Sequence, residues 1–280
     1  MVSSITMRSA GRCLIAIACL VFALLAGARQ VFALGLSTNN PIVDQVLAPG
    51  DAVQGTVELI SSTDQPIHLK VYVEDWEYTP AGDGNKQFAP SGTLPRSAST
   101  WVTFFPRELD VPARGQVLVD YSIRVPKDAS LSGGYYAVLF FESEVKEPAG
   151  ESKDSVTVKY SARLGSLFNV TIKGTAQRQA QLTVESVSPP SRSLPLRVHG
   201  AIANSGNVRV TCDGSFHVLS PANLVAARGE LPRRYLWPGV KAPVDLEWPG
   251  TLEPGAYTVV LTYDCGDNLI LVEEASATVR

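Results

Sequence analysis

Apolar and polar residues alternate with a period of two along most of the chain beyond residue 50. Apolar side chains occupy every second position at 53–59, 67–73 and 117–125, and a denser apolar run covers 135–145. Clusters of Gly, Pro, Asn and Asp separate these runs. A period of two is typical of β-strands, and no segment carries a convincing helical period. The pattern therefore predicts an all-β protein.

One stretch of this pattern occurs twice. Residues 125–142 read VPKDASLSGGYYAVLFFE, and residues 248–264 read WPGTLEPGAYTVVLTYD. Each copy has a proline, a short turn, a glycine just before a tyrosine, and then an apolar run. A tyrosine at this point of an immunoglobulin-like sandwich buries its ring and returns its hydroxyl to nearby backbone. The candidates for this tyrosine corner are Tyr135 and Tyr257.

The repeat divides the chain into two halves of about seven strands each, a number typical of a β-sandwich. The length of 280 residues also fits roughly two domains. We predict two tandem immunoglobulin-like β-sandwich domains after an N-terminal signal peptide. The expected bounds are 1–33 for the signal peptide, 34–174 for the first sandwich and 175–280 for the second.

The signal peptide is predicted from the first 33 residues. Arg8 and Arg12 precede an apolar run over 13–28, and Val31-Phe32-Ala33 offers small or apolar residues for cleavage after Ala33. Cleavage after Ala28 and an uncleaved anchor are the alternatives. No later stretch reaches the roughly 18 continuous apolar residues of a membrane span. We therefore expect an exported mature chain without a membrane span, most simply a periplasmic one.

Charge and cysteines agree with export. The formal net charge of −3 becomes −6 once three signal-peptide arginines are removed, so we expect no binding to nucleic acid. Cys13 and Cys19 leave with the signal peptide, and the mature chain keeps only Cys212 and Cys265. An even pair in an exported protein predicts a disulfide, here within one sheet, with two buried free thiols as the alternative.

The residue combinations of common active sites are missing. His68, His199 and His217 lie in strand-like runs without a second ligand at metal-binding spacing. The paired carboxylates Glu142 and Glu144 fit a solvated sheet face better than glycosidase chemistry. We expect no enzyme activity, no cofactor and no metal site. The aromatic residues around Trp76 suggest either core packing or a platform for a sugar ring.

A long strand is predicted over 155–173. Val156, Val158 and Tyr160 share one face of its first half, whereas Lys159 and Arg163 share the other. Gly165 interrupts the alternation and predicts a β-bulge or a crossing between sheets.

Part of the chain resembles the N-terminal domain of PapD-like periplasmic chaperones that assemble pili and fimbriae. The resemblance rests on the stretch 105–112 (FPRELDVP), the strand 117–125, the turn Pro126-Lys127-Asp128 and the strand that begins at Tyr135. Residues 163–168 (RLGSLF) loosely resemble the closing strand of that domain. Two tandem immunoglobulin-like domains after a signal peptide are also the family's arrangement.

The resemblance implies a function in protein binding by β-strand addition. The closing strand would lend Val156, Val158 and Tyr160 to an incomplete partner, and Lys159 or Arg163 would supply a basic group for the partner's terminal carboxylate. The alternative is that the three apolar side chains fill their own core.

The chain departs from the family pattern because residues 34–53 contain no arginine or lysine. We nevertheless expect a non-enzymatic, chaperone-like protein that binds a secreted or surface protein subunit. An envelope structural module, or one that binds glycan or peptidoglycan through Trp76, is the alternative function.

Overall fold

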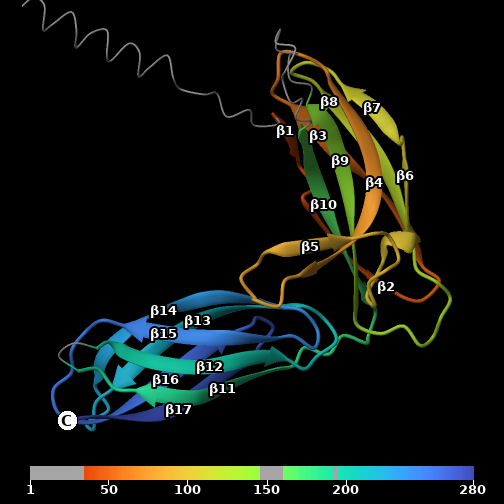
Figure 1. The fold of residues 1–280 in the computed structure, drawn as a ribbon. Helices are drawn as coiled ribbons and strands as arrows, with labels where there is room; N and C mark the ends of the chain where they lie inside the picture. Colours follow the sequence, from red (N-terminus) through yellow and green to blue (C-terminus); the bar gives the residue numbers. More distant parts are fainter. Residues whose placement is uncertain (1–34, 146–159, 192–193) are drawn as a thin grey trace, which may run out of the picture. The chain divides into compact units, whose positions relative to one another are not determined.

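The computed structural model describes residues 35–145, 160–191 and 194–280 (Figure 1). The predicted signal peptide therefore lies outside the described residues, and so do Val156, Val158, Lys159 and the side chain of Tyr160. The described chain is built of β-strands, with one short 3-10 helix and no α-helix. The all-β fold class predicted from the alternation is confirmed.

Ten strands and the short helix belong to the first sandwich: β1 (Leu36–Thr38), β2 (Ile42–Leu47), β3 (Ala52–Ser61), β4 (Ile67–Tyr78), β5 (Lys86–Ala89), η1 (Ser99–Trp101), β6 (Val102–Phe105), β7 (Glu108–Val111), β8 (Gln116–Arg124), β9 (Gly134–Val145) and β10 (Tyr160–Ile172). Seven strands belong to the second: β11 (Ala180–Ser188), β12 (Leu196–Asn204), β13 (Val210–Leu219), β14 (Val225–Leu236), β15 (Lys241–Trp248), β16 (Gly255–Asp264) and β17 (Ile270–Val279).

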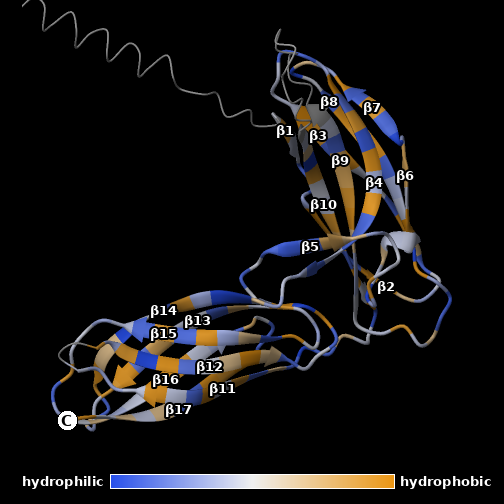
Figure 2. Ribbon diagram, in the orientation of Figure 1, coloured by the Kyte–Doolittle hydropathy of each residue, from blue (hydrophilic) through white to orange (hydrophobic). Residues whose placement is uncertain are grey.

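The first sandwich packs two sheets face to face. One sheet has the order β1-β3-β8-β6, and the other has the order β2-β10-β9-β4-β5, with β7 also paired to β4. Alternate residues point inward along most strands, so orange and blue alternate along many ribbons of Figure 2, whereas β9 is buried on both faces. Leu59, Ile123 and Phe141 are among the fully buried side chains of this core. Residue alternation therefore decides which side chains remain on the outer face of each sheet.

The second sandwich has a three-stranded sheet, β11-β12-β15, and a four-stranded sheet, β14-β13-β16-β17. Its core includes Leu196, Leu236 and Tyr263, all of them fully buried. Two tandem immunoglobulin-like sandwiches are thus confirmed. The domain boundary at 174 and 175 stays a prediction, and it falls in the short connection between β10 and β11.

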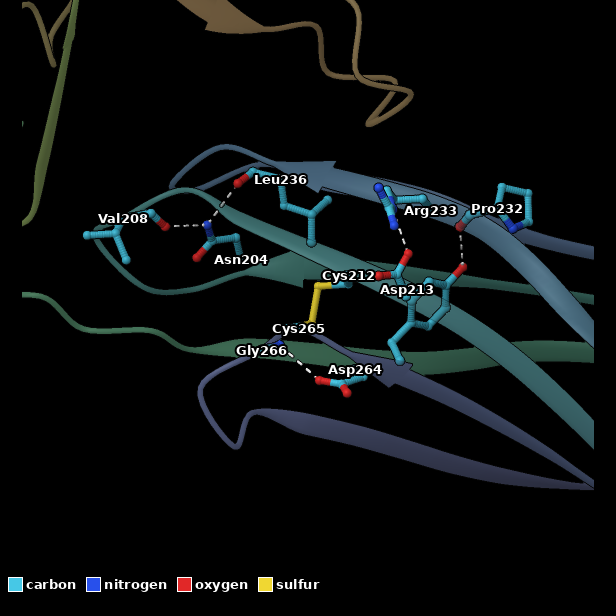
Figure 3. Close-up of a disulfide and its surroundings, with 11 residues drawn as sticks. Asn204, Val208, Cys212, Asp213, Pro232, Arg233, Leu236, Asp264, Cys265 and Gly266 are labelled. Carbon is cyan, nitrogen blue, oxygen red and sulfur yellow. Dashed lines mark hydrogen bonds and ion pairs between the residues drawn. A yellow bond between two sulfur atoms is a disulfide. The ribbon is translucent and has the colours of Figure 1, made fainter. Parts of the chain in front are cut away.

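The predicted disulfide joins Cys212 and Cys265, which are 53 residues apart (Figure 3). Cys212 lies in β13, and Cys265 directly follows β16, the antiparallel neighbour of β13. The bond therefore closes within one sheet, as expected. A loop of this length lowers the entropy of the unfolded chain enough to stabilise the fold by about 4 kcal/mol.

The tyrosine corner is confirmed in the second sandwich. The hydroxyl of Tyr257 donates a hydrogen bond to the carbonyl oxygen of Glu253 at 3.0 Å. Tyr135, the matching residue of the first sandwich, packs on its own core instead, with its ring 4.6 Å from that of Trp101. The two copies share their place in the sheet but hold their tyrosines differently.

The long loop between β5 and β6 is held by a buried carboxylate. Asp75 of β4 is fully buried and accepts hydrogen bonds from the backbone N–H groups of Thr93 and Leu94, both at 2.8 Å, and from the hydroxyl of Ser97 at 2.6 Å. Burial alone would raise the pKa of Asp75, but these hydrogen bonds hold it below its usual range. Asp75 therefore stabilises the loop as an anion.

The bulge predicted at Gly165 is wrong. β10 pairs with β9 in unbroken register from Tyr160 opposite Val145 to Thr171 opposite Gly134. Leu164, Phe168 and the later even-numbered residues all face the core, in phase with the apolar positions before Gly165. Gly165 lies on the outer face of the strand, where its missing side chain leaves room for Val138 and Phe140 of β9.

No helix of the described residues is long and apolar enough to cross a membrane.

Candidate strand-addition edge

The last strand of the first sandwich is covered on one side along only half of its length. β9 pairs with β10 from Tyr160 to Thr171, whereas β2 pairs with it, in parallel, only from Leu167 to Ile172. Among the strands of the described chain, none pairs with residues 160–166 on the side of β2. With respect to the described strands, this half of β10 is an open sheet edge.

The backbone groups that face this edge follow from the hydrogen bonds farther along the strand. The N–H of Leu167 donates to the carbonyl oxygen of Pro41 beside β2, whereas the N–H of Ile172 donates to that of Gly133 beside β9. Alternate residues of a strand turn their backbone groups to opposite neighbours. Ser161, Arg163 and Gly165 therefore direct their N–H and C=O groups to the open side.

A strand added here would meet two different surfaces. On the core side it would lie beside Leu164, which is partly buried against the first core, and Ser166, which is fully buried. On the outer side it would lie beside Arg163 and Leu167, which point away from the core on the other face of the sheet. Backbone pairing with alternate side chains on two faces is the geometry of β-strand addition.

Arg163 lies in a cluster of aromatic and acidic side chains on the outer face. Its guanidinium lies 4.2 Å from the ring centre of Phe140 and 4.9 Å from that of Phe88, and it forms an ion pair with Glu74 at 3.3 Å. Contacts of this kind restrain a long side chain by cation–π attraction and charge. Arg163 is therefore held beside the open edge, with its charge already partly compensated.

A hydrogen bond next to Arg163 fixes a second carboxylate. The hydroxyl of Tyr72 donates to Glu142 at 2.7 Å. This hydrogen bond, together with one from Ser161 and the nearby charge of Arg163, lowers the pKa of Glu142, while burial raises the pKa of Tyr72. Glu142 thus stays ionised next to the edge. The sequence indicates Arg163 and Glu142 separately but not their proximity, because neighbouring strands far apart in the chain bring them together.

The covered half of β10 has an acidic neighbour on β2. Asp44 of β2 lies opposite Asn169 of β10 and accepts a hydrogen bond from its side-chain amide at 2.7 Å. The nearest basic group comes from the second sandwich, where the guanidinium of Arg209 lies 3.8 Å from Asp44. Residues 34–53 supply no arginine or lysine of their own, and the charge of Asp44 is paired with Arg209 of the second sandwich.

Aromatic side chains join the two sandwiches, which together form one compact unit from Leu36 to Arg280. The ring of Trp237 lies 4.1 Å from Tyr136 and 5.0 Å from Trp76, and the backbone N–H of Arg209 donates to the Tyr136 hydroxyl at 2.8 Å. Trp76 itself is only 1% exposed. The packing interpretation of Trp76 is confirmed, and its ring offers no surface to a sugar.

The histidines and acids do not assemble a metal centre in the part of the chain that the structure describes. His68 and His199 each lie 2.8 Å from an aspartate on a neighbouring strand, Asp110 and Asp245 respectively, and all four side chains are exposed. These are cross-strand surface pairs of similar form in the two sandwiches.

No family model matches this chain, and no curated protein sequence matches it.

Solved structures are similar to it in fold. The class 5 fimbriae chaperone CfaA has a TM-score of 0.45 at 11% identity and covers 85% of this chain and 98% of its own. The chaperone YadV has a TM-score of 0.45 at 7% identity, with coverage of 87% and 100%. A Salmonella enterica complex of the SafA pilin with the SafB chaperone has a TM-score of 0.41 at 11% identity, with coverage of 90% and 99%. These similarities extend over 85–90% of this chain, at low sequence identity.

Proposed function

We propose that this protein is a non-enzymatic, chaperone-like protein of the periplasm that binds a secreted or surface protein subunit by β-strand addition. The observation that carries the proposal is the half-covered strand β10, where Ser161, Arg163 and Gly165 direct backbone groups to a side that no described strand occupies. A subunit that lacks one strand would complete its own sheet with this edge.

The apolar residues Val156, Val158 and Tyr160 precede this edge in the sequence. The register of β10 puts even-numbered residues on the face that turns toward the core. If the strand continues toward residue 155, these three side chains lie on the same face as Leu164 and would enter the core of the partner. Lys159 and Arg163 would then lie on the opposite face.

The partner can be identified and the proposal tested in one series. A photo-crosslinking amino acid at position 161 marks the polypeptide that lies beside the edge in living cells, and that polypeptide is then purified with the full chain. The double variant Val156→Asp and Val158→Asp should abolish capture of this subunit while leaving the melting temperature unchanged. Thr157→Asp is the control, because in a strand that continues to residue 155 it would add a charge to the opposite face, and it should retain capture.

Two results would contradict the proposal. Unchanged capture by the double variant would mean that these side chains do not enter the partner. Unfolding of the double variant would mean that they fill the core of their own domain.

A further inference from the structure

We propose that the outer face of the β3-β8-β6 sheet carries a binding trough for a neutral saccharide. This site is separate from the proposed strand-addition edge, which lies in the other sheet of the first sandwich. It also differs from the platform that the sequence suggested at Trp76, which is buried.

Strand register builds the trough as two rows of three side chains. In the first row Ser122 of β8 lies opposite Gln54 of β3 on one side and Thr103 of β6 on the other. In the second row Asp120 lies opposite Thr56 and Phe105. Directly opposed side chains on one face of an antiparallel pair lie about 5 Å apart.

All six side chains point away from the core, and they line a hollow of about 570 Å³. The core-facing neighbours on the same strands, Gly55, Phe104 and Tyr121, complete its lining. The absence of a side chain at Gly55 leaves room for the ring of Tyr121 on the core side. The six outward groups therefore stand above a packed layer, which restrains them.

The chemistry of the lining selects the ligand. Phe105 is 73% exposed, the highest value among the large apolar side chains of the described residues. A ring of this kind packs against a ligand face made of C–H groups. Around it stand hydroxyls, one side-chain amide and one carboxylate, which can donate to or accept from many hydroxyl groups. A pyranose, with an apolar face and a rim of hydroxyls, matches this combination.

Charge favours a neutral saccharide over an acidic one. The trough is lined by the carboxylate of Asp120 and by no lysine, arginine or histidine. Among the described residues, Asp120 has no ion-pair partner. An anionic ligand would meet uncompensated like charge, whereas sugar hydroxyls would donate to the carboxylate. A protein interface would present several apolar anchors, and this trough has one exposed ring.

The test uses the full chain and four named oligosaccharides. Isothermal titration with chitohexaose, cellohexaose and maltohexaose measures binding of neutral ligands, and hexagalacturonate serves as the anionic comparison. At least one neutral hexasaccharide should bind with a dissociation constant of about 1 mM or tighter. Phe105→Ala and Asp120→Asn should each weaken this binding about tenfold or more.

Leu118→Ala is the matched control, because Leu118 is also exposed on β8, at 55%, but does not line the trough. It should change affinity by less than about twofold. The proposal is overturned if none of the neutral hexasaccharides binds with a dissociation constant of about 1 mM or tighter. It is equally overturned if hexagalacturonate binds as tightly, if Phe105→Ala leaves affinity unchanged, or if Phe105 proves to hold a dimer that Phe105→Ala dissociates.

Discussion

Proline substitutions at two adjacent residues of β10 should differ strongly in their effect on stability. The N–H of Ser161 faces the open edge, whereas the N–H of Ala162, which lies opposite Ser143, faces β9. Proline removes the N–H and places its ring in the same direction. Ser161→Pro therefore removes no backbone hydrogen bond of the fold, and Ala162→Pro removes one from the middle of a sheet.

The magnitudes follow from this difference. For Ala162→Pro the lost hydrogen bond costs about 1 kcal/mol, and the carbonyl group of β9 left without its donor costs about 2 kcal/mol more. The expected loss is about 3 kcal/mol. Ser161→Pro should change the free energy of unfolding by less than about 1 kcal/mol, because the fixed φ of proline also restricts the unfolded chain.

Urea unfolding followed by tryptophan fluorescence measures both variants, with Ser161→Ala as the reference for the lost hydroxyl. The reasoning is refuted if Ser161→Pro costs as much as Ala162→Pro. That result would mean that the N–H of Ser161 already has a partner in the folded protein.

Three further predictions concern the framework. Replacing Cys212 and Cys265 by alanine should lower the free energy of unfolding of the second sandwich by about 4 kcal/mol in urea titration, and a loss below about 1 kcal/mol would contradict the entropic estimate. Asp75→Asn should cost about 2 kcal/mol at pH 7. Folding lowers the pKa of Asp75, so the stabilisation by its carboxylate is present above the unfolded pKa of about 3.9 and is lost as the pH falls. The difference in unfolding free energy between wild type and Asp75→Asn should therefore shrink in acid. A difference that stays constant with pH would contradict this prediction. Trp237→Ala should lower the free energy of unfolding by about 3 kcal/mol or more, because the ring is only 6% exposed and packs against Tyr136 and Trp76. Thermal or urea unfolding measures this loss. An unchanged free energy would show that the aromatic contacts do not stabilise the pair of sandwiches.

Much of the fold could be predicted from residue alternation, because alternation reports directly which face of a strand is buried. The pairing of Cys212 with Cys265 could also be predicted, since their positions near the start of one strand and just after the end of its antiparallel neighbour bring them together. Gly165 shows the limit of this reasoning. A glycine inside a strand indicates either a bulge or close packing, and only the neighbours on β9 decide between the two.

The candidate edge was harder to predict, because a strand is an edge only where no neighbouring strand pairs with one of its sides. The sequence does not show that β2 covers β10 only from Leu167 onward, since this depends on parallel pairing of segments more than a hundred residues apart. The aromatic residues around Trp76 posed a similar problem. Their burial depends on Trp237 of the second sandwich, which no local pattern places beside them.

Residue-resolved amide hydrogen exchange on β10 tests the central claim most directly. In the free protein the amides of Ser161, Arg163 and Gly165 should exchange fast, whereas those of Ala162 and Leu164, bonded to β9, should exchange slowly. When the captured subunit is bound, the first three amides should become protected about a hundredfold or more. Protection of these amides in the free protein, or their continued fast exchange in the complex, would contradict strand addition at this edge.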